Sequence, residues 1–287
     1  MVSLYVINSK GEKELFSLQK VYRSAKRVGA SKELSKKIAK VVEKESYPGI
    51  KTSEIFRKVK KLLHQKTPKA ALRFNLKEGM RKLGPTGFPF EKFIGEIFKK
   101  LGFKVRINQH LPGFCLRDYE IDFLAEKGNL LYVGECKYRN FPGERVHSKD
   151  ALANYARFLD ILHGSFFKRK KYRNFRIKTM LVTNTKFTSR ARNYSNCMGV
   201  EVLGWKLPKN RGLEYLIEKE KLYPVTVLPS LNKYLRDIFV LEKIMLVEDV
   251  LKVDPQKFSK KFKISVKYLC PLIKEAKTLL EKQKHGQ

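Results

Sequence analysis

The sequence has few cysteines, and none of them form a pair at metal-binding spacing. Cys115, Cys136, Cys197 and Cys270 lie far apart in the chain, and no C-x-x-C pair occurs. We therefore expect neither a disulfide framework nor a zinc site, and we interpret the four side chains as free thiols. A Walker A motif is also missing, so nothing suggests ATP hydrolysis at a P-loop.

Long apolar runs and acidic residues are scarce as well. No stretch of 18 apolar residues occurs, and the first residues become charged too soon for a signal peptide, so we expect a cytoplasmic protein with no membrane partner. The 62 Lys and Arg residues outnumber 28 Asp and Glu, which gives a formal net charge of +34 at pH 7. This charge favours nucleic acid as a partner, although a ribosome-associated protein or a lysine-rich proteome would explain it equally well.

Pattern divides the 287 residues into three regions, 1–84, 85–208 and 209–287. The first has two short strand patterns around Ser9-Lys10-Gly11, followed by helices expected to begin at Ser17, Ser31, Thr52 or Ser53, and Pro68. The second alternates helix and strand patterns, which predicts an α/β layer with a central mixed sheet. The third is mostly helical. The segment LGPTGFPFE, rich in glycine and proline, marks the first boundary.

The stretch LLYVGECKYR, residues 130–139, places charges in an otherwise apolar strand. Side chains alternate along a strand, so Glu135 and Lys137 share one face while Cys136 faces the other. The preceding strand pattern, YEIDFLAE, carries Asp122, and a hairpin around Lys127-Gly128-Asn129 would bring Asp122 near Glu135. Ile121 and Phe123, on either side of Asp122, are expected to face a core.

Two neighbouring carboxylates repel each other unless a cation lies between them, and oxygen ligands of this kind suit Mg²⁺ or Mn²⁺. Such a metal lowers the pKa of a bound water, which Lys137 is placed to position or deprotonate. A third candidate is Glu96, which lies among apolar residues of the helix expected just before the sheet. The alternative is that Glu135 and Lys137 form an ordinary solvated ion pair.

The order of a helix glutamate, Asp122 and Glu135-Cys136-Lys137 resembles the PD-(D/E)XK nuclease core. The segments GFPFEKFIGEIFKKLGF, GECKYR, VTNTKFTSRARNY and GVEVLGW are similar to Mrr-like restriction endonucleases over residues 86–208. The resemblance implies a restriction-endonuclease-like α/β/α domain in which Asp122 and Glu135 bind the metal, Lys137 assists the attacking water and Glu96 contributes to the metal shell.

The chain departs from that family at two places. Ile121 replaces the proline of the family motif, and the helix SKDALANYARFLDIL lacks the glutamine that many members carry. Asp150, Asn154, Tyr155 and Arg157 are the polar candidates on this helix, and Asp150, Tyr155 and Arg157 are the ones to test.

The N-terminal region combines a turn, a helix N-terminus and the cations Lys13, Lys20 and Arg23, a pattern that favours phosphate binding but also fits a basic helix face in water. VINSKGEKELFSLQKVYRSAKRVGAS and PGIKTSEIFRKVKKLL resemble the ATP-cone, a regulatory nucleotide-binding module of ribonucleotide reductases and their repressor. The resemblance implies an ATP or dATP pocket lined by Glu14, Ser17, Lys20 and Thr52, with Val6 and Ile7 near the base. Asn8 stands where the family usually has lysine, so we expect either phosphate contact from Lys10 or Lys13 or a low affinity.

The C-terminal region has a pattern of paired helices like that of helix-hairpin-helix DNA-binding modules. Those modules usually need glycines in the hairpin, whereas glycine occurs only at the two ends of this region. It is therefore interpreted either as a DNA-binding module or as a helical packing or dimerisation domain.

Together these features predict a Mg²⁺-dependent DNA endonuclease that ATP or dATP regulates, with homo-oligomerisation as one route of regulation. Two alternatives stay open. One is a DNA- or junction-binding protein whose nuclease core is inactive. The other is a nucleotide-sensing transcriptional regulator, against which the missing zinc ribbon counts.

Overall fold

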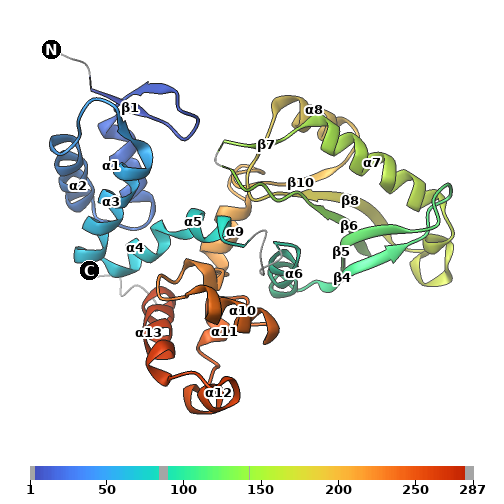
Figure 1. Ribbon diagram of the computed structural model, residues 1–287. Helices are drawn as coiled ribbons and strands as arrows, with labels where there is room; N and C mark the ends of the chain where they lie inside the picture. Colours follow the sequence, from blue (N-terminus) through green and yellow to red (C-terminus); the bar gives the residue numbers. More distant parts are fainter. Residues whose placement is uncertain (1–3, 84–89, 142, 282–287) are drawn as a thin grey trace. The chain divides into compact units, whose positions relative to one another are not determined.

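The computed structural model describes residues 4–83, 90–141 and 143–281, which pack into two units (Figure 1). The first, called the helical unit, comprises Met1–Met80, Pro224–Ile238 and Val247–Gln287. The second, called the sheet unit, comprises Arg81–Tyr223 and Phe239–Leu246. Within the described ranges, no helix has the length and apolar character needed to cross a membrane. The predicted boundary at 84–85 lies outside the described residues.

The helical unit begins with a three-stranded sheet of order β2-β1-β3, made of β1 (Tyr5–Ile7), β2 (Lys13–Leu15) and β3 (Ile50–Lys51). The predicted hairpin is confirmed, since β1 and β2 are antiparallel and Gly11 has the positive φ that its turn requires. Three helices follow: α1 (Leu18–Arg27), α2 (Lys32–Lys44) and α3 (Thr52–Lys66). The hydroxyls of Ser17 and Ser31 accept hydrogen bonds from backbone N–H groups of α1 and α2, as their capping role predicts.

The single helix predicted from Pro68 is interrupted at Asn75, giving α4 (Pro68–Phe74) and α5 (Leu76–Arg81). The Asn75 side chain accepts from Lys60 and donates to the carbonyl of Val227, 2.8 Å away. The hydroxyl of Thr226 also donates to the carbonyl of Gly79. These buried contacts join a C-terminal segment to α4 and α5.

The region 209–287 is therefore distributed over both units. Its first helix, α9 (Leu213–Glu220), belongs to the sheet unit. The next helix, α10 (Lys233–Leu241), begins in the helical unit and ends in the sheet unit. The last three, α11 (Val247–Val250), α12 (Pro255–Phe262) and α13 (Leu269–Leu280), belong to the helical unit.

The sheet unit contains a five-stranded mixed sheet of order β10-β8-β6-β5-β4. The strands are β4 (Lys104–Leu111), β5 (Tyr119–Lys127), β6 (Leu130–Cys136), β8 (Arg176–Val182) and β10 (Glu201–Leu203). β5 runs antiparallel to its two neighbours, β4 and β6, whereas β6, β8 and β10 are parallel. The predicted β5–β6 hairpin is confirmed, and Gly128 in its turn has a positive φ. A short parallel pair joins β7 (Arg145–Val146) to β9 (Lys186–Phe187).

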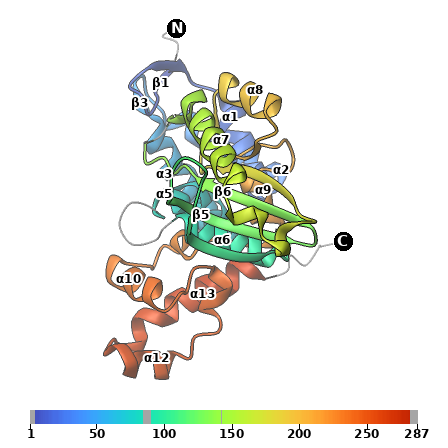
Figure 2. The ribbon, with the colours of Figure 1, turned by 90° about the vertical axis from the view of Figure 1, so that its right-hand side faces the viewer.

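Helices α6 (Phe90–Lys100) and α7 (Ser148–His163) cover opposite faces of this sheet (Figures 1 and 2). On β6, the Tyr132 ring packs against Phe98 of α6, whereas the adjacent Val133 lies in an apolar cluster with Phe158 of α7. A further helix, α8 (Ser189–Cys197), packs beside α7. The mixed α/β class predicted from the sequence is thus confirmed, and its carboxylate-bearing strands, β5 and β6, lie inside the sheet.

Candidate functional site: the end of strands β5 and β6

In strand β5, the regular alternation of side chains between the two faces of the sheet is interrupted at Asp122. Ile121 lies in the apolar cluster with Phe158 of α7, whereas the Phe123 ring is 5.2 Å from the ring of Phe98 on α6. Residues two apart in a regular strand share a face, so the alternation is interrupted between Ile121 and Phe123. Both side chains are buried, as predicted, but they face different cores.

The side chain of Asp122 turns toward the end of β6. Its Oδ2 accepts a hydrogen bond from the backbone N–H of Cys136 at 2.6 Å. Burial raises the pKa of Asp122 to about 7, and the carboxylates of Glu135 and Glu91 add to the rise, while the Cys136 N–H and Lys137 oppose it. Negative charge at this point is therefore unfavourable unless a cation compensates it.

Glu135 is only 7% exposed, yet one of its oxygens contacts two cations. Its Oε1 is 2.5 Å from Nζ of Lys137 and 3.0 Å from a guanidinium nitrogen of Arg157. Arg157 also donates to the carbonyl of Glu120. This arginine, one of the α7 candidates, thus links α7 to both carboxylate-bearing strands and fixes the orientation of Glu135.

The helix glutamate that acts on Asp122 is Glu91. The Phe90 ring lies 5.7 Å from the ring of Tyr138, which places the first turn of α6 beside the residues that follow β6. Glu96, the glutamate chosen from the sequence, instead pairs with Lys99 at 2.7 Å. The choice of Glu96 rested on its apolar neighbours. The sequence feature that would favour Glu91 is its position in the first turn of this helix.

The chain that follows β6 is held by polar groups from α7 and from the residues directly after β8. Arg139 makes a two-pronged ion pair with Asp150, and Asn184 exchanges hydrogen bonds with the backbone of Arg139. The hydroxyl of Thr183 donates to the carbonyl of Lys137. Asp150 therefore orients the loop, and Thr183 and Asn184 are positioning residues that the sequence analysis did not single out.

The other two polar candidates on α7 have packing roles. The ring of Tyr155 lies edge-on to Tyr194 of α8, at 6.2 Å. Asn154 is buried and donates to the hydroxyl of Thr179 on β8. Neither residue is among the groups that act on Asp122 or pair with Glu135.

The donor set suits a divalent cation bound by few protein ligands. Within the described ranges, no three or more His, Cys, Asp and Glu side chains form a ready-made metal cage. Mg²⁺ usually keeps several waters and binds through one or two carboxylates together with substrate phosphate. Asp122 and Glu135 supply two such carboxylates. Burial, and then the negative charge of Glu135, raise the pKa of Asp122, and a bound cation would offset both effects.

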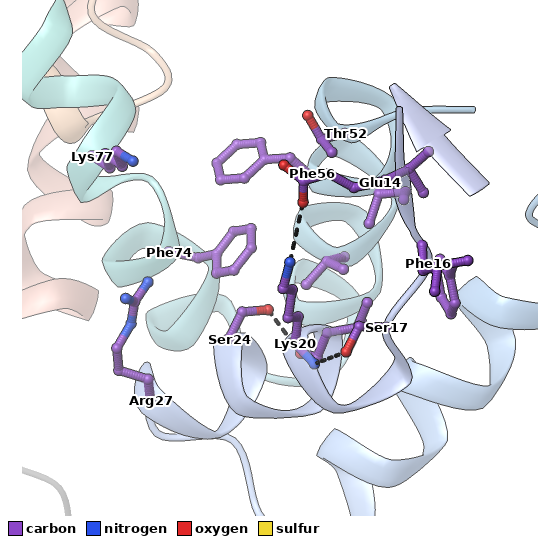
Figure 3. Close-up of a pocket in the computed structure, with 15 residues that line it drawn as sticks. Glu14, Phe16, Ser17, Lys20, Ser24, Arg27, Thr52, Phe56, Phe74 and Lys77 are labelled. Carbon is purple, nitrogen blue, oxygen red and sulfur yellow. Dashed lines mark hydrogen bonds and ion pairs between the residues drawn. The ribbon is translucent and has the colours of Figure 1, made fainter. Parts of the chain in front are cut away.

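The helical unit has a pocket of about 260 Å³ (Figure 3). It is lined by five of the eight residues that the sequence analysis names for nucleotide binding: Val6, Glu14, Ser17, Lys20 and Thr52. The rings of Phe56 and Phe74 stack in it, 4.6 Å apart. Lys20 pairs with Glu14 at 3.1 Å, and Arg27 and Lys77 are further cations of the lining.

The remaining three predicted residues, Ile7, Lys10 and Lys13, lie outside that lining. Ile7 neighbours Val6 on β1, so its side chain takes the opposite face of the strand. The ammonium of Lys13 lies over the ring of Tyr5, 5.1 Å from its centre. Asn8, which replaces the expected lysine, donates to Glu14.

Comparison with known proteins finds a relative of this chain that matches over most of its own length. An uncharacterized protein of Archaeoglobus fulgidus is 31% identical over 189 residues, which are 65% of this chain and 99% of that protein. This chain belongs to the AF1548-like family. The family model described as AF1548-like, C-terminal, matches residues 223–280.

A solved structure agrees with this assignment. The crystal structure of AF1548, described as a protein of unknown function, is 31% identical, with a TM-score of 0.55, over 66% of this chain and 95% of that one. About a third of this chain therefore lies outside the part that matches AF1548.

Proposed function

We propose that this AF1548-like protein is a metal-dependent DNA endonuclease of the PD-(D/E)XK type. The observation that supports it most is the convergence of Asp122, Glu135 and Lys137 where β5 changes sides and β6 ends. In a purely structural role, a buried carboxylate pair with an adjacent lysine would lower stability, because apolar residues of similar size fill such positions without the desolvation penalty of buried charges.

Each residue has a distinct task in this proposal. Asp122 and Glu135 would hold Mg²⁺ or Mn²⁺, which when bound polarises the scissile phosphate and acidifies a water molecule. Lys137 contacts the Glu135 oxygen and reaches solvent, so it can orient the attacking water. Arg157 keeps Glu135 in place, and Glu91 adds negative charge at the metal position.

DNA is the proposed polymer because of the protein's charge. A formal net charge of +34 favours polyanions and speeds their encounter. The proposed cellular location is the cytoplasm.

We propose that ATP or dATP binds the pocket of the helical unit, as in an ATP-cone. The stacked Phe56 and Phe74 offer an apolar surface for a base, and Lys20 and Arg27 offer charge for phosphates. The nucleotide would regulate cleavage, with a change in homo-oligomerisation as the proposed route.

The direct test is cleavage of supercoiled, linear, single-stranded and branched DNA with Mg²⁺ or Mn²⁺, in the absence and presence of ATP or dATP. We expect metal-dependent cleavage that Glu135→Gln abolishes and nucleotide alters. Tight DNA binding without cleavage under any of these conditions would favour the inactive, junction-binding alternative.

A further inference from the structure

The loop between β4 and β5, residues 112–118, exposes two large apolar side chains. Phe114 is 74% exposed and Leu116 is 56% exposed. The cationic Arg117 follows them and is also exposed. Exposed apolar side chains side by side on a short loop are a feature of binding surfaces.

This loop is held in one conformation by α7. Asp160 accepts hydrogen bonds at its side chain from the backbone N–H groups of Cys115 and Leu116, and its carbonyl accepts from the N–H of Phe114. The Cys115 N–H is the main reason that the pKa of Asp160 falls to about 2, so the carboxylate stays ionised at neutral pH. The apolar tip is therefore presented on a preorganised support.

Close backbone packing fixes the base of the loop. A Cβ atom on Gly164 would lie 2.8 Å from the backbone of Gly113, and one on Gly113 would lie 2.2 Å from the Asp160 carboxylate. Only glycine at both positions permits this approach.

A strongly basic segment starts directly after Gly164, which packs on the base of the loop. Residues 165–176 contain no acidic side chain and six cations, all exposed: Lys168, Arg169, Lys170, Lys171, Arg173 and Arg176. Phe166, Phe167 and Tyr172 anchor the segment in the apolar cluster that also contains Leu111. The chain enters this segment through Gly164, which packs on Gly113 of the loop.

The same helix connects the loop to the candidate catalytic carboxylates. Asp160, which holds the loop, lies three residues after Arg157, which pairs with Glu135, and residues three apart are neighbours on a helix surface. Figure 1 shows α7 running along the sheet. A polymer that contacts the loop can therefore also reach the end of β6.

We infer that residues 112–117 and 165–176 form a surface for unstacked DNA bases, which makes DNA with a single-stranded stretch or a duplex-to-single-strand junction the substrate class. The Phe114 ring stacks on a base, Leu116 packs against its neighbour, and the cations contact the phosphates. Aromatic stacking combined with a basic track is how proteins bind unpaired strands without reading sequence. The inference deepens the proposed function and rests on it for the identity of the polymer.

The test is DNA binding by the full chain, without metal, measured by fluorescence anisotropy on a forked duplex and on a blunt duplex of equal length. Stacking on a base contributes about 1–3 kcal/mol, so Phe114→Ala should weaken fork binding by roughly 5- to 150-fold. Blunt-duplex binding should change by less than about 2-fold, and Phe114→Trp should restore the fork preference because it keeps a stacking ring. Tyr234→Ala removes another exposed aromatic ring, in the helical unit, and is the matched control.

Replacing Lys168 and Lys170 together by alanine should weaken both ligands and reduce the salt dependence of binding by about two phosphate contacts. Equal loss on both duplexes for Phe114→Ala, or no loss, would overturn the stacking role. Self-association that Phe114→Ala abolishes, with the fork preference intact, would overturn it too and identify the tip as a protein contact. Because no metal is present, failure of cleavage alone leaves this binding result unchanged.

Discussion

The sheet unit and the helical unit handle charge in different ways. At the end of β5 and β6, carboxylates are buried, and Asp122 has a raised pKa because burial and neighbouring negative charge disfavour its ionised form. In the pocket of the helical unit, the Lys20–Glu14 pair is exposed at the rim and aromatic rings line the interior. The first site therefore places negative charge where a bound cation would stabilise it, whereas the second is lined mainly by apolar surface.

Removing the paired charges of the sheet unit should have the largest effect. Glu135→Gln and Lys137→Ala should each reduce the cleavage rate by roughly 10³-fold or more, because each removes a group that acts on the metal or the water. DNA affinity should change by less than about 3-fold, since exposed cations supply most of it. Loss of binding and fold together would make the pair structural, which circular dichroism and anisotropy would reveal.

The two glutamates of α6 provide a matched pair. Glu91→Gln should slow cleavage by about 10- to 100-fold, because its charge acts on Asp122. Glu96→Gln, which removes only an ion pair with Lys99, should change the rate by less than about 2-fold. Single-turnover rates on one DNA substrate measure both, and the reverse order would restore Glu96 as the metal-shell residue.

The stability of the metal-free protein should fall as pH rises. The pKa of Asp122 is raised from 3.8 to about 7 in the folded state, so its contribution is fully present below pH 4 and is lost as pH approaches 7. The loss is at most about 4 kcal/mol, from roughly three pKa units. Urea unfolding at pH 5 and 8 measures the part of this loss that falls between those two pH values, about 2–3 kcal/mol.

Asp122→Asn should remove most of that pH dependence, and added Mg²⁺ should stabilise the native protein but not this variant. The exposed Asp237→Asn is the control, with the same chemical change outside the cluster. An unchanged pH dependence in Asp122→Asn would show that ionisation of the buried Asp122 does not lower the free energy of unfolding.

The smallest effect concerns the pocket. Lys20→Ala should weaken ATP or dATP binding by about 5- to 10-fold, since one partly screened charge contact is worth about 1 kcal/mol. Lys13→Ala should leave the affinity within about 2-fold, because Lys13 lies over Tyr5 and outside the lining. Isothermal titration calorimetry distinguishes the two, and equal affinities would exclude Lys20 from the nucleotide site.

Sequence patterns predicted features that depend on neighbours in the chain. The caps at Ser17 and Ser31 and the turns at Gly11 and Gly128 follow from local backbone requirements, and each is present. The strand assignments and the proximity of Asp122 to Glu135 followed from alternation and the hairpin. These are the signals that a single sequence carries most directly.

Features that depend on distant contacts were not predictable in the same way. The break at Asn75 is stabilised by Val227, far along the chain. The effect of Glu91 on the pKa of Asp122 depends on the packing of Phe90 on Tyr138. The interrupted alternation at Asp122 requires cores on both faces of the sheet. In each case tertiary packing overrides a regular local pattern.

The central claim is that Asp122 and Glu135 hold a divalent metal, and its most direct test does not require the natural DNA substrate. Mn²⁺ titration followed by electron paramagnetic resonance should detect a bound ion in the native protein, with an affinity at least about 10-fold weaker in Glu135→Gln and in Asp122→Asn. Equal Mn²⁺ binding by the native protein and both variants, all folded, would contradict the account and leave Glu135 and Lys137 as a structural ion pair.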